Sequence, residues 1–416
     1  MASPPVRDGA LLVDAKGRIV ALGPEATVPR PEGVSTFRFP DAVLLPGFVN
    51  AHTHLELTGL RGALPEPDFF EWIQHVRRAK DEVSPETYLD WAREGVREAW
   101  RHGATMVADT GTSGAVVRAL TEMGGAGIAY HEAIHPDPGR AEATLAAARE
   151  MVTQLRREAG PRVVVGLSPH APYTVSRTLY AQVASLARAE GWPLAGHLAE
   201  SAAETELVRA GTGPFADLWR RRGIPLDPPA GSPVRLLADL GVLGPDFLAI
   251  HAVQTDPADA GILAAAGAAV VVCPRSNARH GHGSAPLQRY RERGLRVALG
   301  TDSVASVDSL DLLAEAREAR VQAGLSAEAA IRLLTLDGAR ALGKEGEVGS
   351  LEAGRWADLV VIRPSHPPAL PPYRLTALPP DLIAEAILLG QPGDILATFV
   401  AGQPVHQAHS GGAALP

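Results

Sequence analysis

Histidine and acidic residues in this 416-residue chain stand where short apolar segments end. His52 and His54 follow one such segment, and later segments end in His197, His251 and Asp302. Imidazole and carboxylate groups together suit Zn²⁺ or a similar divalent ion. Residues two apart on a strand point the same way, so the first two imidazoles can face one ion. The arrangement predicts a metal site at these segment ends.

A His-X-His pair alone is a weak signal, because a chain with 14 histidines produces such pairs by chance. His280 and His282 form a second pair, which we interpret as structural or substrate-contacting, with a second metal site as the alternative. The specific signal is the first pair combined with single histidines and an aspartate at the later segment ends.

The elements that must position these residues are short apolar segments alternating with helical patterns. Strands are predicted at residues 42–50, 104–109, 127–132, 162–168, 192–197, 247–251, 268–273 and 296–302. Helical patterns are clearest at residues 84–103, 139–160 and 176–191. Eight strands alternating with helices predict an α/β fold, a (β/α)₈ TIM barrel, whose active site lies at the carboxyl ends of the strands. A doubly wound open sheet is the alternative, but no Gly-rich phosphate loop follows the first strand.

Both ends of the chain have a different texture, with short β-rich segments and glycine turns. We predict one small β-sandwich-like domain built from both termini, with residues 1–45 and 343–416 flanking a catalytic barrel at 46–342. The proline-rich stretch Pro364–Pro380 is predicted to be a loop.

Composition excludes several classes of protein. A net charge of −8 and only 5% aromatic residues argue against nucleic-acid binding. A single cysteine, Cys273, excludes an intrachain disulfide and a Cys-rich zinc site. No signal-peptide core and no apolar stretch of membrane-spanning length is apparent. We expect a cytoplasmic protein with no membrane or nucleic-acid partner.

Five segments resemble a known family. They are PGFVNAHTHLE (46–56), GHLAES (196–201), CPRSNARHGHGSAP (273–286), GTDS (300–303) and GSLEAGRWADLVV (349–361). In this order they resemble the amidohydrolase superfamily, and within it the branch of amino-aryl deaminases and chlorohydrolases.

The resemblance implies a role for individual residues. It implies that one divalent ion, Zn²⁺ with Fe²⁺ or Mn²⁺ as alternatives, is bound by His52, His54, His197 and Asp302. It implies catalytic roles for Glu200, His251 and Asp302. Substrate contacts are expected from His170, Arg61, Arg275 and Asn277.

The residues themselves agree with a mononuclear hydrolytic site. Three imidazoles and a carboxylate leave a coordination position for water, as in catalytic metal sites. Some amidohydrolases bridge two metals with a carboxylated lysine from a central strand. No lysine lies between Lys80 and Lys344, so the later barrel strands cannot supply one.

The resemblance implies an aminohydrolase that replaces a ring amine with oxygen and releases ammonia. The favoured substrate is an adenine-type nucleoside such as 6-aminodeoxyfutalosine, a menaquinone intermediate whose benzoate the arginines near the barrel mouth could hold. Alternatives are a deaminase of S-adenosylhomocysteine or methylthioadenosine and a triazine-type chlorohydrolase. A non-catalytic metal-binding protein is disfavoured because the residue set is complete. The partner is a small heteroaromatic molecule, and a homodimer is possible by similarity to other members.

Overall fold

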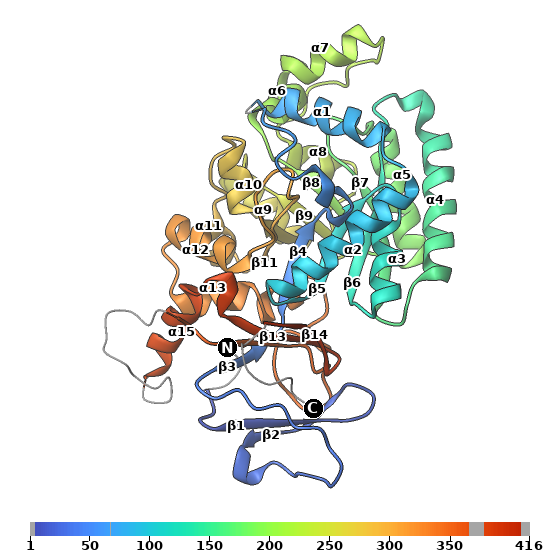
Figure 1. The fold of residues 1–416 in the computed structure, drawn as a ribbon. Coiled ribbons are helices and arrows are strands. Elements are labelled where there is room, and N and C mark those ends of the chain that lie inside the picture. Colours follow the sequence, from blue (N-terminus) through green and yellow to red (C-terminus); the bar gives the residue numbers. More distant parts are fainter. Residues whose placement is uncertain (1–4, 67, 366–377, 409–416) are drawn as a thin grey trace. The chain divides into compact units, whose positions relative to one another are not determined.

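The computed structural model describes residues 5–66, 68–365 and 378–408, and the chain forms two compact units (Figure 1). One unit comprises the segments Met1–Asn50, Arg97–Met106 and Asp311–Pro416. The other comprises Ala51–Val96 and Val107–Leu310 and contains the predicted site residues.

An eight-stranded sheet organises the second unit, although its first two strands begin in segments of the other unit. Its strands follow the chain order without a crossover. They are β4 (Phe48–Thr53), β5 (Ala104–Gly111), β6 (Gly127–Ala133), β7 (Val163–Pro169), β8 (Leu194–Leu198), β9 (Phe247–His251), β10 (Ala269–Val272) and β11 (Arg296–Leu299). Every residue of β8, β9 and β10 is buried, as in a barrel core.

The first and last strands meet at their carboxyl ends. Thr53 forms a parallel bridge with Asp302, and the backbone N–H groups of Thr301 and Asp302 both donate to His52 O at 3.0 Å. Gly300 permits this approach, because a Cβ atom there would lie 2.7 Å from His52 N. The sheet is therefore a TIM-like (β/α)₈ barrel, as predicted.

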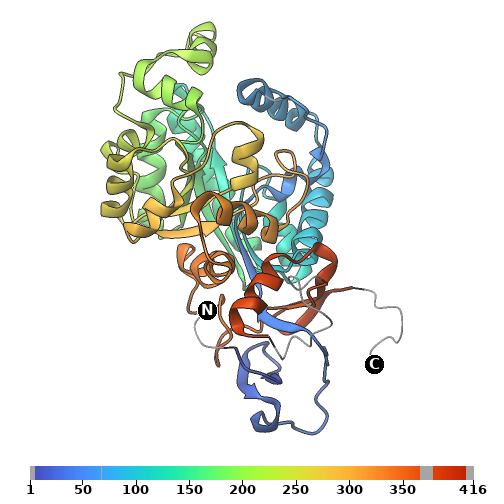
Figure 2. The same ribbon diagram turned by 90° about the vertical axis from the view of Figure 1, so that its left-hand side faces the viewer.

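Helices connect the strands and lie outside them in the two ribbon views (Figure 1, Figure 2). They are η2 (Leu55–Leu60), α1 (Phe69–Asp81), α2 (Pro85–Arg101), α3 (Ala115–Met123), η3 (Pro138–Arg140), α4 (Ala141–Glu158), α5 (Arg177–Glu190), α6 (Ala202–Ala210), α7 (Gly213–Arg221), α8 (Pro233–Asp239), α9 (Pro257–Ala266), α10 (Pro274–Arg279) and α11 (Leu287–Glu292). Their ends follow capping chemistry. Ser176 caps α5 by accepting from Leu179 N, and Gly191 ends that helix with a φ of 63°.

The other unit contains two antiparallel sheets. Strands β1 (Gly9–Val13) and β2 (Ile19–Pro24) form a hairpin. The second sheet has the order β14-β13-β12-β3 and thus joins both ends of the chain, as predicted. The strands of this sheet are β3 (Val43–Pro46), β12 (Leu359–Ile362), β13 (Ile395–Val400) and β14 (Gln403–Gln407). The helices of the unit are η1 (Glu25–Thr27), α12 (Leu312–Ala323), α13 (Ala327–Leu333), α14 (Leu336–Ala341), α15 (Pro380–Leu388) and η5 (Pro392–Asp394). Its core includes Ile19, Leu359, Val361 and Phe399.

Two details differ from the sequence expectation or lie beyond it. The run predicted as one strand at 42–50 is two strands, because the chain passes from β3 to β4 at Gly47, and β3 pairs with β12 instead of joining the barrel. Most of the proline-rich stretch predicted as a loop lies outside the described residues. The predicted domain boundaries stay a prediction. Among the described residues, no helix combines the length and apolar character needed to cross a bilayer.

Candidate active site and metal centre

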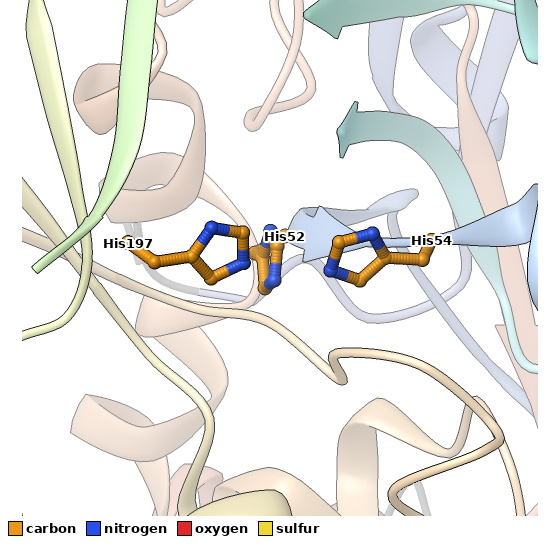
Figure 3. A group of neighbouring side chains, drawn as sticks. All are labelled: His52, His54 and His197. Atoms are coloured by element: carbon orange, nitrogen blue, oxygen red, sulfur yellow. The ribbon is translucent and has the colours of Figure 1, made fainter. Parts of the chain in front are cut away.

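The predicted metal-binding side chains gather at the carboxyl ends of the barrel strands. His52 lies in β4, His54 directly follows it, and His197 lies in β8. One nitrogen from each of these imidazoles lies within 4.8 Å of the others, and the three rings converge (Figure 3). A second group with the same spacing contains His52, His251 and Asp302.

The donor atoms in this cluster fit a divalent cation. The Nε2 atoms of His52 and His54 both lie 3.5 Å from Asp302 Oδ1. His52 Nε2 is buried and has no hydrogen-bond partner among the described residues. A buried polar atom without a partner is costly unless an ion or ligand satisfies it. These imidazole nitrogens and the carboxylate oxygen therefore fit an ion such as Zn²⁺.

Neighbouring groups orient these donors. His197 Nδ1 lies 3.1 Å from the backbone oxygen of His170, so this nitrogen donates and Nε2 keeps its lone pair. Thr110 Oγ1 lies 3.2 Å from His54 Nδ1. Ser276 donates to Asp302 Oδ2 at 2.5 Å, which leaves Oδ1 facing the imidazoles.

Burial sets the protonation states of the cluster. It lowers the pKa of His52 to about 4 and that of His197 well below its ordinary value. Burial alone would raise the pKa of Asp302, but its close approach to His52 and the nearby imidazoles of His54 and His251 hold that pKa well below the usual range. At neutral pH His52 and His197 are thus neutral imidazoles and Asp302 is an ionised carboxylate, the forms that bind metal.

Positive φ angles mark the strand ends. His251 has a φ of 71° and Asp302 a φ of 60°, and Ala199 lies at 51°. Residues other than glycine rarely adopt this left-handed conformation, and such positions concentrate at functional sites.

The carboxylate of Glu200 is buried beside the cluster and has three neighbours. His251 Nε2 and His282 Nε2 each lie 3.5 Å from Glu200 Oε1, and the Tyr173 hydroxyl donates to Oε2 at 3.3 Å. Burial alone would raise the pKa of Glu200, but His251 and His282 lower it below its ordinary value. Glu200 is therefore an ionised carboxylate at neutral pH, held beside two imidazoles.

A second glutamate holds the backbone of Glu200. Glu204, on α6, accepts from the N–H groups of Ala199 and Glu200 at 2.7 and 2.8 Å. Ser201 caps the same helix by accepting from Glu204 N. Burial raises the pKa of Glu204 to about 8, against the effect of these backbone donors.

Asn277 contacts His251. Its Oδ1 lies 3.0 Å from His251 Nδ1, and its own backbone N–H donates to Cys273 O at the start of α10. This contact places the proton on Nδ1 and leaves His251 Nε2 facing Glu200. Part of the Asn277 amide is thus already engaged by the protein.

Both arginines expected to contact substrate interact with Asp308. Arg275 forms an ion pair with Asp308 and also donates to Ser309 O at 3.3 Å. Arg61 donates to the backbone oxygen of Asp308. A substrate anion would have to compete with Asp308, whose side chain is 82% exposed.

Aromatic side chains gather around Glu200. The ring centroid of Phe69 lies 4.7 Å from that of His282 and 5.9 Å from that of Tyr173. Trp72 packs against His280, with 4.6 Å between the ring centroids. The second His-X-His pair therefore packs against α1, and His282 also reaches Glu200.

Sequence reasoning missed several of these residues. Tyr173 and Glu204 carried no role, although Tyr173 follows His170 closely and Glu204 follows Glu200 by one helical turn. Sequence reasoning assigned no role to Lys80, the last lysine before Lys344, whereas its ammonium group lies 3.3 Å from the buried Glu56 Oε1. No sequence motif indicates these side-chain contacts before the fold is available.

The comparison with protein families identifies the chain. The model of the amidohydrolase family matches residues 43–405. The chain belongs to the amidohydrolase family. The resemblance read from the five sequence segments is thus confirmed, together with the prediction of an amidohydrolase-type enzyme.

Curated relatives cover most of this amidohydrolase. A 5-methylthioadenosine/S-adenosylhomocysteine deaminase of Symbiobacterium thermophilum is 32% identical over 418 residues, 96% of this chain and 89% of the relative. An aminodeoxyfutalosine deaminase of Deinococcus radiodurans is 36% identical over 321 residues, 73% of this chain and 74% of the relative.

Solved structures share the fold. An adenosine deaminase from Xanthomonas campestris with bound zinc has 29% sequence identity and a TM-score of 0.79 over 95% of this chain and 88% of its own. Atrazine chlorohydrolase from Arthrobacter aurescens, complexed with zinc, has 22% identity and a TM-score of 0.78 over 96% of this chain and 90% of its own, which shows the common fold alone.

Proposed function

We propose that this amidohydrolase is a metal-dependent aminohydrolase that removes an exocyclic amine from an adenine-type ring. The observation that carries the proposal is the Glu200 carboxylate, which accepts from the Tyr173 hydroxyl and lies 3.5 Å from His251 Nε2 and His282 Nε2, beside the His/Asp cluster. An ionised carboxylate next to a metal site suits proton transfer during hydrolysis of an exocyclic C–N bond. The names of the curated relatives support the same chemistry.

The metal would be held by His52, His54, His197 and Asp302. When bound, a divalent ion acts as a Lewis acid and makes water a stronger nucleophile at neutral pH. Zn²⁺ is the ion we propose, since the donor set suits it and the Xanthomonas relative contains it. Fe²⁺ and Mn²⁺ remain alternatives for three imidazoles and a carboxylate.

The chain's own residues move the protons. Asp302 and His251 are placed to accept the proton of the attacking water. Glu200, which is ionised beforehand, takes up in turn the two protons that the water loses to these residues, and delivers one to the ring nitrogen beside the attacked carbon and the other to the leaving amine. The net reaction adds one water, replaces the bond between the ring carbon and the exocyclic nitrogen with a bond to oxygen, and releases one ammonia.

The proposed substrate is 6-aminodeoxyfutalosine. The Deinococcus relative carries that activity in its name, and Arg61 and Arg275 offer a place for the benzoate. Deamination of methylthioadenosine or S-adenosylhomocysteine is the second candidate, because the Symbiobacterium relative covers nearly the whole chain. His170 and Asn277 are proposed as further substrate-facing residues. A cytoplasmic location and a homodimer stay predictions.

A substrate panel tests the proposal. Ammonia release is measured from the zinc-loaded protein with 6-aminodeoxyfutalosine, S-adenosylhomocysteine, methylthioadenosine, adenosine, guanine and cytosine. We expect a kcat/KM of about 10⁴ M⁻¹s⁻¹ or more on the first compound and much less on the others. Faster release from methylthioadenosine or S-adenosylhomocysteine would replace the proposed substrate. A chlorinated triazine is added to the panel. If it releases chloride while none of the six compounds releases ammonia, the proposed aminohydrolase activity is overturned.

A further inference from the structure

A buried carboxylate oxygen and an imidazole nitrogen face each other next to the metal cluster. Glu132 lies in β6 and His170 follows β7, and Glu132 Oε1 is 3.9 Å from His170 Nε2. Only 3% of the Glu132 side chain and 11% of the His170 side chain are exposed. A donor atom from each, together with one from His197, forms a group within 4.8 Å. The space between Glu132 and His170 therefore borders the place where chemistry is proposed.

The hydrogen bonds of His170 fix which of its nitrogens carries the proton. His170 Nδ1 lies 2.6 Å from Thr174 Oγ1, and the Thr174 hydroxyl donates its only hydrogen to Ala171 O at 3.1 Å. Thr174 can therefore only accept from His170, so the proton is on Nδ1 and Nε2 presents a lone pair.

Glu132 presents the second acceptor. Within the described parts of the chain, its Oε1 is buried and has no hydrogen-bond donor. A carboxylate oxygen and an imidazole lone pair cannot bond to each other, and each is costly to leave unsatisfied when buried. The pair requires a ligand group that supplies two polar hydrogens.

We propose that Glu132 and His170 form a subsite for the vicinal diol of the substrate's ribose. This inference rests on the proposed function, because an adenine-type nucleoside carries such a diol next to its base. One hydroxyl donates to Glu132 Oε1 and the other to His170 Nε2, so that the sugar supplies the donor that the buried Glu132 Oε1 lacks within the described residues. Glu132 is thus a specificity residue that selects a ribonucleoside over a free base or a deoxynucleoside.

The experiment compares adenosine with 2′-deoxyadenosine and 3′-deoxyadenosine on the zinc-loaded protein. We expect each missing hydroxyl to lower kcat/KM at least tenfold, chiefly through KM, since sites built to bind a hydroxyl discriminate strongly against its absence. In Glu132→Gln, the kcat/KM for adenosine should fall to the wild-type value for the deoxynucleoside that lacks the hydroxyl facing Glu132. Removal of that hydroxyl from the substrate should then lower the kcat/KM of the variant little further. Glu158→Gln, a change to an exposed ion pair on α4, is the matched control and should leave all three rates unchanged.

Two further readouts separate the possible outcomes. Calorimetric binding of the same three nucleosides to metal-free protein should show the same preference for adenosine. Equal rates and equal binding for the three compounds in the wild-type protein would overturn the subsite without any variant. Two tightly bound zinc ions in the wild type and one in Glu132→Gln would overturn it in favour of a cation held by these acceptors. Absence of ammonia from 6-aminodeoxyfutalosine, methylthioadenosine, S-adenosylhomocysteine and adenosine alike, with adenosine still bound in preference to its deoxy forms, would refute the proposed function and retain the subsite.

Discussion

The contact between Asn277 and His251 predicts a specific catalytic defect. Asn277 Oδ1 lies 3.0 Å from His251 Nδ1, and the His251 ring is only 1% exposed. Asn277→Leu keeps a similar side-chain volume but removes the acceptor. The buried Nδ1–H then lacks a partner, which costs about 1–3 kcal/mol. The imidazole is also free to adopt the other tautomer, which would turn its lone pair away from Glu200.

The magnitude follows from these two effects. Loss of a partner that orients an active-site histidine typically lowers activity about 10- to 100-fold. We therefore expect kcat of Asn277→Leu to fall by roughly that factor, equivalent to about 1.4–2.7 kcal/mol of transition-state stabilisation. The free energy of unfolding should fall by about 1–3 kcal/mol, while the metal content stays unchanged.

Steady-state ammonia release, urea unfolding and metal analysis on the same preparations provide the assay. Asn277→Asp is the matched control, because it keeps an oxygen acceptor and removes only the Nδ2 group, which has no hydrogen-bond partner among the described residues. We expect the Asp variant to retain more activity than the Leu variant. A Leu variant with kcat within twofold of the wild type would refute the orienting role of Asn277.

Three further predictions follow from the site. Glu200→Gln should lower kcat by about 10³-fold or more while binding the same amount of zinc, since it removes the proposed proton carrier and no proposed ligand; retained turnover would remove Glu200 from the mechanism. Arg275→Ala should raise KM for 6-aminodeoxyfutalosine about tenfold and leave KM for methylthioadenosine, which has no carboxylate, unchanged; an equal rise for both would exclude a benzoate contact. In the metal-free protein, burial lowers the pKa of His52 to about 4 and of His170 to about 3, so the unfolded chain binds more protons below about pH 6.5 and stability falls as the pH drops. Each imidazole should cost about 2 kcal/mol at pH 5 relative to pH 7, measured by urea unfolding, and His170→Gln should show a smaller loss; a midpoint unchanged between the two pH values would contradict these low pKa values.

The barrel and the cluster were predictable because they follow from local patterns. Apolar segments ending in His197, His251 and Asp302 locate the carboxyl ends of strands, and a barrel brings all such ends to one mouth. The division of the first segment at Gly47 was not predictable, because β3 is fixed by pairing with β12, more than 300 residues away in the chain.

The environment of Glu200 was also beyond the sequence. Tyr173 and His282 reach its carboxylate from 27 and 82 residues away, and neither spacing carries a motif. Positive φ angles at His251 and Asp302 arise from tertiary contacts that override the local preference of these residue types. Residue types could therefore identify the chemistry, whereas the partners that tune it required the fold.

The most direct test of the central claim is the reaction of zinc-loaded protein with 6-aminodeoxyfutalosine in ¹⁸O-labelled water, followed by mass spectrometry of the product and an ammonia assay. Hydrolytic deamination predicts one heavy oxygen in each product molecule and one ammonia released for each. A product without the label, or labelled product formed without ammonia, would contradict the account.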